Sequence, residues 1–296
     1  MTITAAMVKE LRETTSAGMM DCKKALTECE GDMAKAIDWL REKGIAKAAK
    51  KAGRIAAEGL STFVVNGNKA LVLEVNSETD FVSKNEQFLK LLDDTANALI
   101  NSDVTTLEDA LNLVVDGSRL EDLFINATAT IGEKITLRRF AVLIKEDADT
   151  FGAYKHAGGR ISVILVLKNT DNNEFSKQIA MQVASMNPSY ISRDHMPADM
   201  IEHERGIQAE ILKNDETLAG KPEKVLAGIL EGRLSKQLQD MSLVDQAFFL
   251  TPDHKCGQVL KEANTEVTSF VRYEVGEGIE KKEDNFAEEV AKMTNN

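Results

Sequence analysis

Few side chains of the kinds that carry catalysis or hold metals occur in this sequence, and they are scattered. The histidines stand at four separate positions, His156, His195, His203 and His254. Metal sites need ligands at close, paired spacing, and these positions show none, so we interpret each histidine as a surface or structural residue. We therefore expect no catalytic residue and no metal site.

A glycine pair, Gly158-Gly159, comes directly before an apolar strand pattern, which is typical of a turn. A phosphate-binding loop would need a Gly-Lys-Ser/Thr ending followed by a helix, and this sequence has neither. Acidic pairs such as Asp93-Asp94 fit solvated helix faces. We expect no bound cofactor, and the absence of a convergent set of reactive groups favours a protein that works through its surfaces.

Composition and charge narrow the function classes further. The chain has 296 residues, of which 43% are hydrophobic and 28% charged, as in a soluble globular protein with room for two or three structural units. Its formal net charge of −12 argues against a general nucleic-acid binder, whose affinity comes mostly from Lys and Arg at phosphates. We expect no direct nucleic-acid partner.

The cysteines and the hydropathy pattern indicate the cellular compartment of the protein. Cys22 and Cys29 lie on one helix pattern, too far along its axis to bridge, and Cys256 is remote in sequence. The N-terminus lacks the pattern of a signal peptide, and no apolar stretch approaches the ~20 residues that cross a bilayer. We expect reduced thiols, a cytoplasmic location and no membrane association.

One polar stretch, residues 76–82, stands out between two patterned segments. The apolar run at 70–75 predicts a strand, and a helical pattern starts at Asn85, so residues 76–82 form a strand-to-helix loop. Phe81 is the unusual residue in it. Its ring either packs under its own helix or is offered to another molecule, and packing at home is the more common outcome for a single aromatic residue.

The first 54 residues have a helical texture. Apolar spacing predicts three short helices, with a turn at 14–18, a glycine stop at Gly31 and a cap at Asp32. We expect the third helix to end at Gly44. Residues 46–54 are rich in Lys and Ala and form a helical or partly helical connector, which is either a solvated linker, the favoured interpretation, or a basic contact for an acidic partner.

Residues 55–146 and 147–275 show the same order of elements. In the first half, a hairpin with its turn at Asn66-Gly67 leads to the loop and a helix that begins near Phe88. In the second, a strand at 160–167 leads to a polar loop and a helix that begins near Phe175. Similar strands, at 135–142 and 267–275, close the two halves. The sequence therefore predicts an α+β core made of two related halves.

A helical insert at 198–240 interrupts the second half. Amphipathic patterns at 200–212 and 223–238, separated by Gly220 and Pro222, predict an antiparallel helical hairpin. It is either a projecting lobe or a self-association surface, so a homodimer through it is possible. Residues 276–296 form a C-terminal module with an apolar helical stripe at Phe286, Val290 and Met293.

Several motifs resemble those of the bacterial elongation factor Ts family. They run in order along the chain, at 8–26, 50–59, 74–82, 154–161 and 271–278. The third contains the Thr-Asp-Phe-Val motif of that family. Where many members carry Cys-Gln before this motif, the present chain has Ser77-Glu78, which adds a negative charge beside it.

The resemblance implies both a fold and a partner. The three N-terminal helices would form a domain of ubiquitin-associated (UBA) type, followed by the two-part core, the hairpin and the C-terminal helix. The partner would be elongation factor Tu, bound in its GDP-carrying and nucleotide-free states. The chain would act as a guanine-nucleotide exchange factor and not as an enzyme, by placing Thr79, Asp80, Phe81 and Val82 near the partner's Mg²⁺ site.

Other positions that match partner contacts of the family are Arg12, Met19, Met20 and His156. Two different classes of function compete with this interpretation. A helical adaptor would use the N-terminal helices without any effect on nucleotide release, and a small-molecule enzyme would need a pocket lined by titratable groups.

Overall fold

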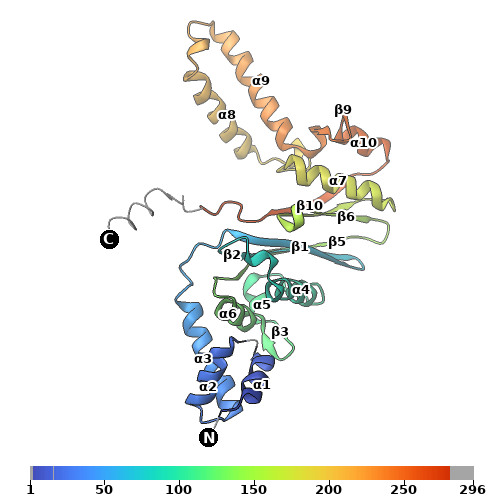
Figure 1. The fold of residues 1–296 in the computed structure, drawn as a ribbon. Helices are drawn as coiled ribbons and strands as arrows, with labels where there is room; N and C mark the ends of the chain where they lie inside the picture. The colour runs from blue at the N-terminus through green and yellow to red at the C-terminus, as the bar shows by residue number, and fades with distance from the viewer. Residues whose placement is uncertain (1–2, 16, 281–296) are drawn as a thin grey trace. The chain divides into compact units, whose positions relative to one another are not determined.

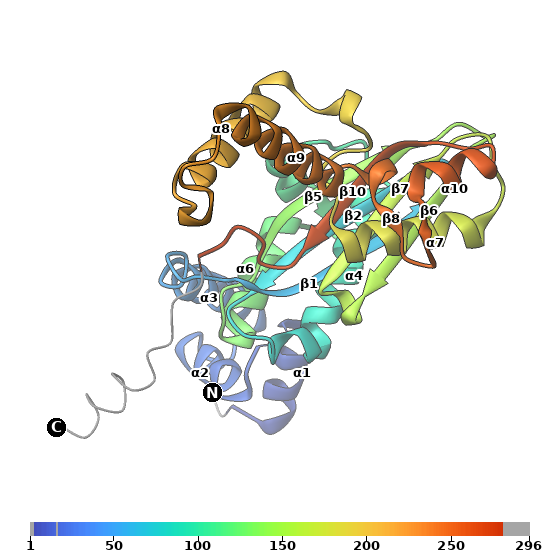
Figure 2. The same cartoon turned by 90° about the horizontal axis from the view of Figure 1, so that it is seen from above.

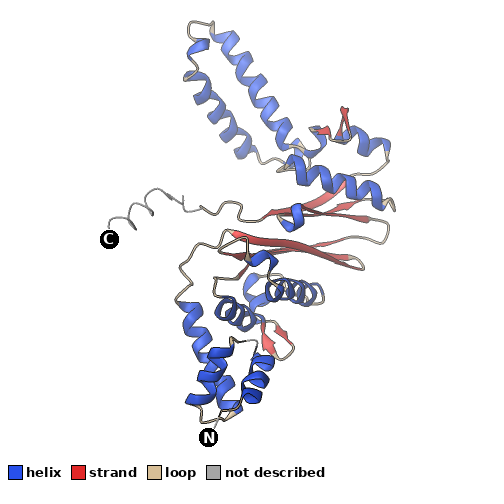
Figure 3. Ribbon diagram, in the orientation of Figure 1, coloured by secondary structure: helices blue, strands red, loops and turns tan. Residues whose placement is uncertain are grey.

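The chain folds into a mixture of helices and antiparallel sheets, which confirms the predicted α+β class (Figures 1 and 3). The computed structural model describes residues 3–15 and 17–280. The helix predicted from the stripe at Phe286, Val290 and Met293 lies outside the described residues, as does most of the 276–296 module. No described helix is both long and apolar enough to span a membrane.

The described residues form two compact units. Unit 1 comprises the described parts of Met1–Thr62, Leu73–Ala141 and Tyr273–Asn296. Unit 2 comprises Phe63–Val72 and Val142–Arg272. The chain therefore passes more than once between the units, and sequence-continuous domain boundaries stay a prediction.

Three helices begin unit 1, as the N-terminal pattern predicts. They are α1 (Ala5–Thr15), α2 (Met19–Glu28) and α3 (Met33–Ala49). Their shared core is small and apolar, and Leu11, Cys22, Leu26 and Ala36 are fully buried in it. The Asp32 carboxylate accepts the Lys35 backbone N–H at 3.1 Å and so caps α3. The resemblance of these helices to a UBA domain stays a prediction.

The predicted end of the third helix at Gly44 is wrong, because α3 continues to Ala49. Gly44 is buried, and a Cβ atom there would lie 3.5 Å from the Cβ of Ala129. The small residue lets α3 run close to α6 (Leu120–Ile131). A glycine that the sequence suggests as a stop signal is thus a packing position inside a helix.

One three-stranded sheet has the order β1–β2–β5. Its strands are β1 (Glu58–Asn66), β2 (Lys69–Ser77) and β5 (Thr136–Ile144). Between β2 and β5 come α4 (Glu86–Ile100), α5 (Leu107–Asn112), the short strands β3 (Val114–Val115) and β4 (Ser118–Arg119), and α6. The predicted Asn66-Gly67 hairpin is confirmed, and Gly67 has the positive φ of 57° that such turns favour.

The second sheet has the order β6–β7–β10, the same arrangement of a hairpin plus a later strand beside its second member. The strands are β6 (Thr150–His156), β7 (Ile161–Leu167) and β10 (Val267–Glu274). β6 and β7 pair antiparallel from Thr150↔Leu167 to His156↔Ile161. Helix α7 (Asn173–Met186) packs on both strands and buries Ile179 and Val183.

Shorter elements complete the described chain. Unit 2 also holds β8 (Ala247–Phe248), β9 (Thr251–Lys255) and α10 (Cys256–Glu262). Single turns of 3-10 helix occur at η1 (Val82–Lys84), η2 (Ala157–Gly159), η3 (Arg193–His195), η4 (Glu216–Leu218) and η5 (Leu243–Asp245). The sequence patterns did not predict β6, β8, β9 or α10.

The predicted helical insert forms two helices that lie side by side, α8 (Ala198–Lys213) and α9 (Glu223–Met241) (Figure 2). Leu234 and Leu238 pack with Met196 at the base of this hairpin. Farther along α8, Ile207 and Ile211 are exposed, one helical turn apart. Self-association through the hairpin stays a prediction.

Candidate functional site

A buried strand and a capped helix hold the two ends of the loop that the sequence singles out. β2 enters it with Asn76 and Ser77 both buried, and the Ser77 hydroxyl donates to the Thr79 carbonyl at 2.9 Å. α4 leaves it from Asn85, whose side-chain oxygen accepts the backbone N–H groups of Gln87 at 2.8 Å and Phe88 at 3.2 Å. The loop is therefore a short bridge between a buried strand and a capped helix.

Phe81 points out from this bridge, and 80% of its surface is exposed. The alternative in which its ring packs under α4 is wrong, because a ring packed there would be buried; the buried aromatic ring of α4 is that of Phe88. Phe81 has ordinary helical backbone angles, φ −60° and ψ −37°, so its display requires no strained backbone. Asp80, directly before it, is exposed too.

Val82 and Thr79 anchor the loop to the rest of the protein. Val82 is only 6% exposed, and the single turn of η1 that it begins brings the Ser83 hydroxyl to the Asp80 carbonyl at 2.6 Å. The four residues of the predicted motif thus divide into two roles. Thr79 and Val82 face the protein, whereas Asp80 and Phe81 face outward.

Glu133, in the turn between α6 and β5, binds Thr79 at two points. Its carboxylate accepts the Thr79 backbone N–H at 2.9 Å and the Thr79 hydroxyl at 2.6 Å. The sequence patterns did not single out Glu133, since it looks like an ordinary polar turn residue after Gly132. Only the folded chain brings it to the loop, across 54 positions in sequence.

Glu78 makes a reciprocal bond from the loop to the same turn. Its carboxylate accepts the Lys134 backbone N–H at 2.6 Å and pairs with the Arg54 guanidinium at 3.2 Å. The negative charge that Glu78 adds beside the motif is therefore paired within the protein, with Arg54. It does not project beside Phe81 as a free charge.

The Lys-rich connector contacts its own protein at the same place. The Lys51 ammonium donates to the Gly132 carbonyl, and the Lys134 ammonium donates to the carbonyls of Ala52 at 2.6 Å and Arg54 at 3.0 Å. The end of the connector is thus hydrogen-bonded to its own protein beside the loop, although Lys50, Ala52 and Arg54 stay exposed, as the favoured solvated linker predicts.

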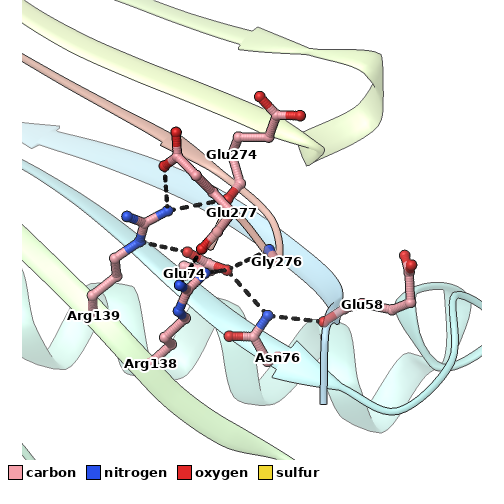
Figure 4. A network of polar contacts seen from close by, with 8 residues as sticks. All are labelled: Glu58, Glu74, Asn76, Arg138, Arg139, Glu274, Gly276 and Glu277. Carbon is pink, nitrogen blue, oxygen red and sulfur yellow. Dashed lines mark hydrogen bonds and ion pairs between the residues drawn. The ribbon is translucent and has the colours of Figure 1, made fainter. Parts of the chain in front are cut away.

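A network around Glu74, two positions before Asn76 on β2, stabilises the strand that leads to the loop (Figure 4). Glu74 has no exposed surface. Its carboxylate accepts Arg138 at 2.9 Å, Arg139 at 2.6 Å and the Gly276 backbone N–H at 2.8 Å. A buried carboxylate is costly unless it is paired and hydrogen-bonded, and these three donors supply both.

The network sets the charge state of its members. Burial alone would raise the pKa of Glu74, but the hydrogen bonds from Gly276, Arg138 and Arg139 outweigh it and hold that pKa below its usual range. Burial raises the pKa of Tyr273, whose ring lies 4.2 Å from the Arg139 guanidinium. Glu74 is therefore ionised and serves structure, since it is out of reach of solvent.

The remaining predicted contact residues lie on other elements. Arg12 on α1 is exposed, and Met19 and Met20, at the start of α2, are 58% and 75% exposed. His156 ends β6 in unit 2, is exposed, and has its Nδ1 atom 3.2 Å from the Tyr154 hydroxyl. Each residue is accessible to another molecule.

The described chain offers little for binding a metal or for thiol chemistry at Cys256. No group of three or more His, Cys, Asp or Glu side chains that could hold a metal occurs among residues 3–15 and 17–280. Burial raises the pKa of the Cys256 thiol to about 12, so the reactive thiolate is scarce at neutral pH. The exposed aromatic ring on an anchored loop is instead suited to contact with another protein.

Comparison with known proteins identifies the kind of protein that carries this loop. The family model described as elongation factor TS matches residues 78–277, which include the Thr79–Val82 loop and His156. A curated elongation factor Ts from Acholeplasma laidlawii (strain PG-8A) is 55% identical over 296 residues, the full length of both chains. The chain belongs to the elongation factor Ts family.

Membership of the elongation factor Ts family places the chain in translation elongation, among nucleotide exchange factors of protein biosynthesis. The family match begins at Glu78, directly before the motif. The N-terminal helices with Arg12, Met19 and Met20 precede it, and they are covered by the full-length similarity to the Acholeplasma protein.

Proposed function

We propose that this elongation factor Ts family member binds elongation factor Tu carrying GDP, promotes the release of GDP and so allows GTP to bind. The single observation that carries the proposal is Phe81, whose ring is 80% exposed on a loop held from below by Thr79 and Val82. An aromatic side chain on an anchored loop is suited to insertion into a partner, because the backbone that carries it loses little conformational freedom on binding.

The target of the loop follows from the chemistry of GTPases. Nucleotide phosphates and a Mg²⁺ ion stabilise each other in such a site, since the metal is the largest local charge. A ring inserted beside that site would displace the segments that hold the metal, and the Asp80 carboxylate would lie next to it. Loss of Mg²⁺ coordination would then weaken the hold on GDP.

Exchange also requires preference for one state of the partner. A ligand shifts an equilibrium only through its differential affinity for the two states, so the loop has to bind the displaced arrangement more tightly than the GDP-filled one. The chain itself needs no reacting group for this task. Its function as an exchange factor without catalytic chemistry is thus compatible with a site made of an aromatic ring and one carboxylate.

Further contacts would hold the two proteins together in the cytoplasm while the loop acts. Met19 and Met20 offer unbranched, adaptable side chains at the start of α2, with Arg12 on the neighbouring helix. We assign these residues to partner docking, together with His156. None of these contacts would displace Mg²⁺, so they should affect affinity more than the rate within the complex.

The proposal is tested by mixing the chain with elongation factor Tu that carries a fluorescent GDP analogue. We expect GDP release to accelerate in proportion to added chain until the complex is saturated. Co-purification of the two proteins without any change in the release rate would instead support a helical adaptor. Failure of both binding and release would contradict the proposal.

Replacing His156 with alanine tests the ranking of the contact residues. At sub-saturating concentrations of the chain we expect GDP release to slow by about threefold, because loss of one exposed docking contact is worth under ~1 kcal/mol of affinity. The variant Lys155→Ala, at the adjacent exposed position, is the control. Stopped-flow fluorescence measures GDP release with His156→Ala and with Phe81→Ala. Slower release with His156→Ala than with Phe81→Ala would contradict the ranking.

A further inference from the structure

One carboxylate outside the loop determines how Thr79 is held. Glu133 accepts both the backbone N–H of Thr79 at 2.9 Å and its hydroxyl at 2.6 Å, and bonds to an ionised acceptor are the stronger kind. Thr79 lies two residues before Phe81, so its orientation sets where the exposed segment begins. We infer that Glu133 is a positioning residue for Phe81, an inference that rests on the proposed exchange function.

A carboxylate can position a loop only if its own turn is fixed. Lys134, the next residue, donates its backbone N–H to Glu78 at 2.6 Å and its ammonium to the carbonyls of Ala52 and Arg54 at 2.6 and 3.0 Å. The turn is therefore bonded to the loop on one side and to the connector on the other. These bonds fix the backbone of the turn that carries Glu133.

Glu78 and Glu133 form reciprocal hydrogen bonds between the loop and the turn. Glu78 of the loop binds the backbone of the turn, and Glu133 of the turn binds the backbone of the loop. Such an exchange determines the register of the two segments, because a shift of one residue would break both bonds. Since Glu133 contacts Thr79 and not Phe81, it leaves the ring free for the partner.

Loss of the Glu133 carboxylate should release Thr79 without unfolding the loop. Val82 stays buried and Asn85 still caps α4, so the far end of the loop keeps its anchor. The near end would sample several orientations, of which only a fraction presents Phe81 correctly. The rate of a step that needs the correct orientation falls in proportion to that fraction.

The variant Glu133→Ala is therefore expected to lower the maximal rate of GDP release about tenfold, with the half-saturating concentration changed by less than about threefold. Glu133→Gln should fall between Glu133→Ala and the unaltered chain, because an amide oxygen can still accept one of the two bonds. Glu86→Ala is the matched control, since it removes an exposed carboxylate from the first turn of α4, close in sequence to Phe81.

Coupling to the ring distinguishes positioning from general damage. In a chain that already carries Phe81→Ala, adding Glu133→Ala should slow release no further, because Glu133 acts through the missing ring. Equal slowing in both backgrounds would overturn the inference. So would an unchanged release rate in folded Glu133→Ala.

Hydrogen exchange at the Thr79 amide supplies a readout on the free chain. We expect protection in the unaltered protein, at least about a tenfold loss of protection in Glu133→Ala, and a smaller loss in Glu133→Gln, which keeps one acceptor and serves even if Glu133→Ala does not fold. Unchanged protection would overturn the inference. If elongation factor Tu shows no acceleration by the unaltered chain, the proposed function fails separately, whatever the Thr79 amide shows.

Discussion

Replacing Phe81 with alanine is expected to slow GDP release from elongation factor Tu by roughly thirtyfold, the equivalent of about 2 kcal/mol for an aromatic hot spot. The physical reason is the loss of the ring that displaces the Mg²⁺-holding segments of the partner. Because the ring is exposed in the free chain, its removal should leave the folding of the chain unchanged. Stopped-flow release of a fluorescent GDP analogue measures the rate, and thermal unfolding checks the fold.

A matched variant separates the ring's role from a general effect of removing exposed apolar surface. Ile144, at the end of β5, is 74% exposed, close to the value for Phe81, and Ile144→Ala should release GDP at the unaltered rate. The release rate with Phe81→Leu should lie between the rates with Phe81→Ala and with the unaltered chain, since leucine keeps part of the side-chain volume. A folded Phe81→Ala protein with normal exchange would rule out the wedge.

The largest expected effect on stability comes from Glu74. Glu74→Gln keeps the shape of the side chain but leaves Arg138 and Arg139 without the buried charge that they share. Removing one partner of a buried ion pair costs about 3–5 kcal/mol. We therefore expect the free energy of unfolding to fall by that amount, which denaturant unfolding would show as a lower midpoint. Glu266→Gln, which removes an exposed partner of Lys168, should change the midpoint little.

The same network gives a pH dependence with a definite sign. The folded pKa of Glu74 is held below its ordinary value of 4.5, so its stabilisation is fully present above that pH. It is lost as the pH falls through the folded pKa, where the carboxylate takes up a proton. The stability difference between the unaltered chain and Glu74→Gln should therefore shrink below pH 4.5 and stay constant near neutrality. A difference that grows on acidification would contradict this assignment.

The sequence predicts local elements wherever a single pattern determines them. The Asn66-Gly67 turn specifies a hairpin because few other residues adopt its positive φ, and the apolar stripe that includes Phe88 specifies α4. Strand β6 escapes prediction because Gly152 interrupts its pattern. A Cβ atom at Gly152 would lie 2.2 Å from the carbonyl oxygen of Ser176, so the glycine is required where α7 crosses β6.

Long-range partners are harder to find in sequence. Glu74 looks like an interruption in the apolar run at 70–75, and Arg138-Arg139 looks like a polar pair on a distant strand. A charged residue inside an otherwise buried strand does signal a need for an opposite charge, but nothing local says which one supplies it. Glu133 gives even less signal, since its role depends on a turn meeting a loop.

The motif itself shows both the reach and the limit of sequence reasoning. Resemblance to elongation factor Ts draws attention to Thr79, Asp80, Phe81 and Val82 together. It does not say that two of them face inward and two outward, because that division depends on the buried Val82 and on the carboxylate of Glu133. In the structure, the ring of Phe81 is the exposed apolar group of the motif, and Thr79 and Val82 anchor the loop that carries it.

The most direct test of the wedge compares GDP release with Mg²⁺ present and with Mg²⁺ removed by a chelator. Elongation factor Tu would be saturated with either the unaltered chain or Phe81→Ala. If Phe81 acts by dislodging the metal, the ratio of the two release rates should be roughly thirtyfold with Mg²⁺ and fall toward one in the chelator. A ratio that is the same in both conditions would contradict displacement of Mg²⁺ by the Phe81 loop.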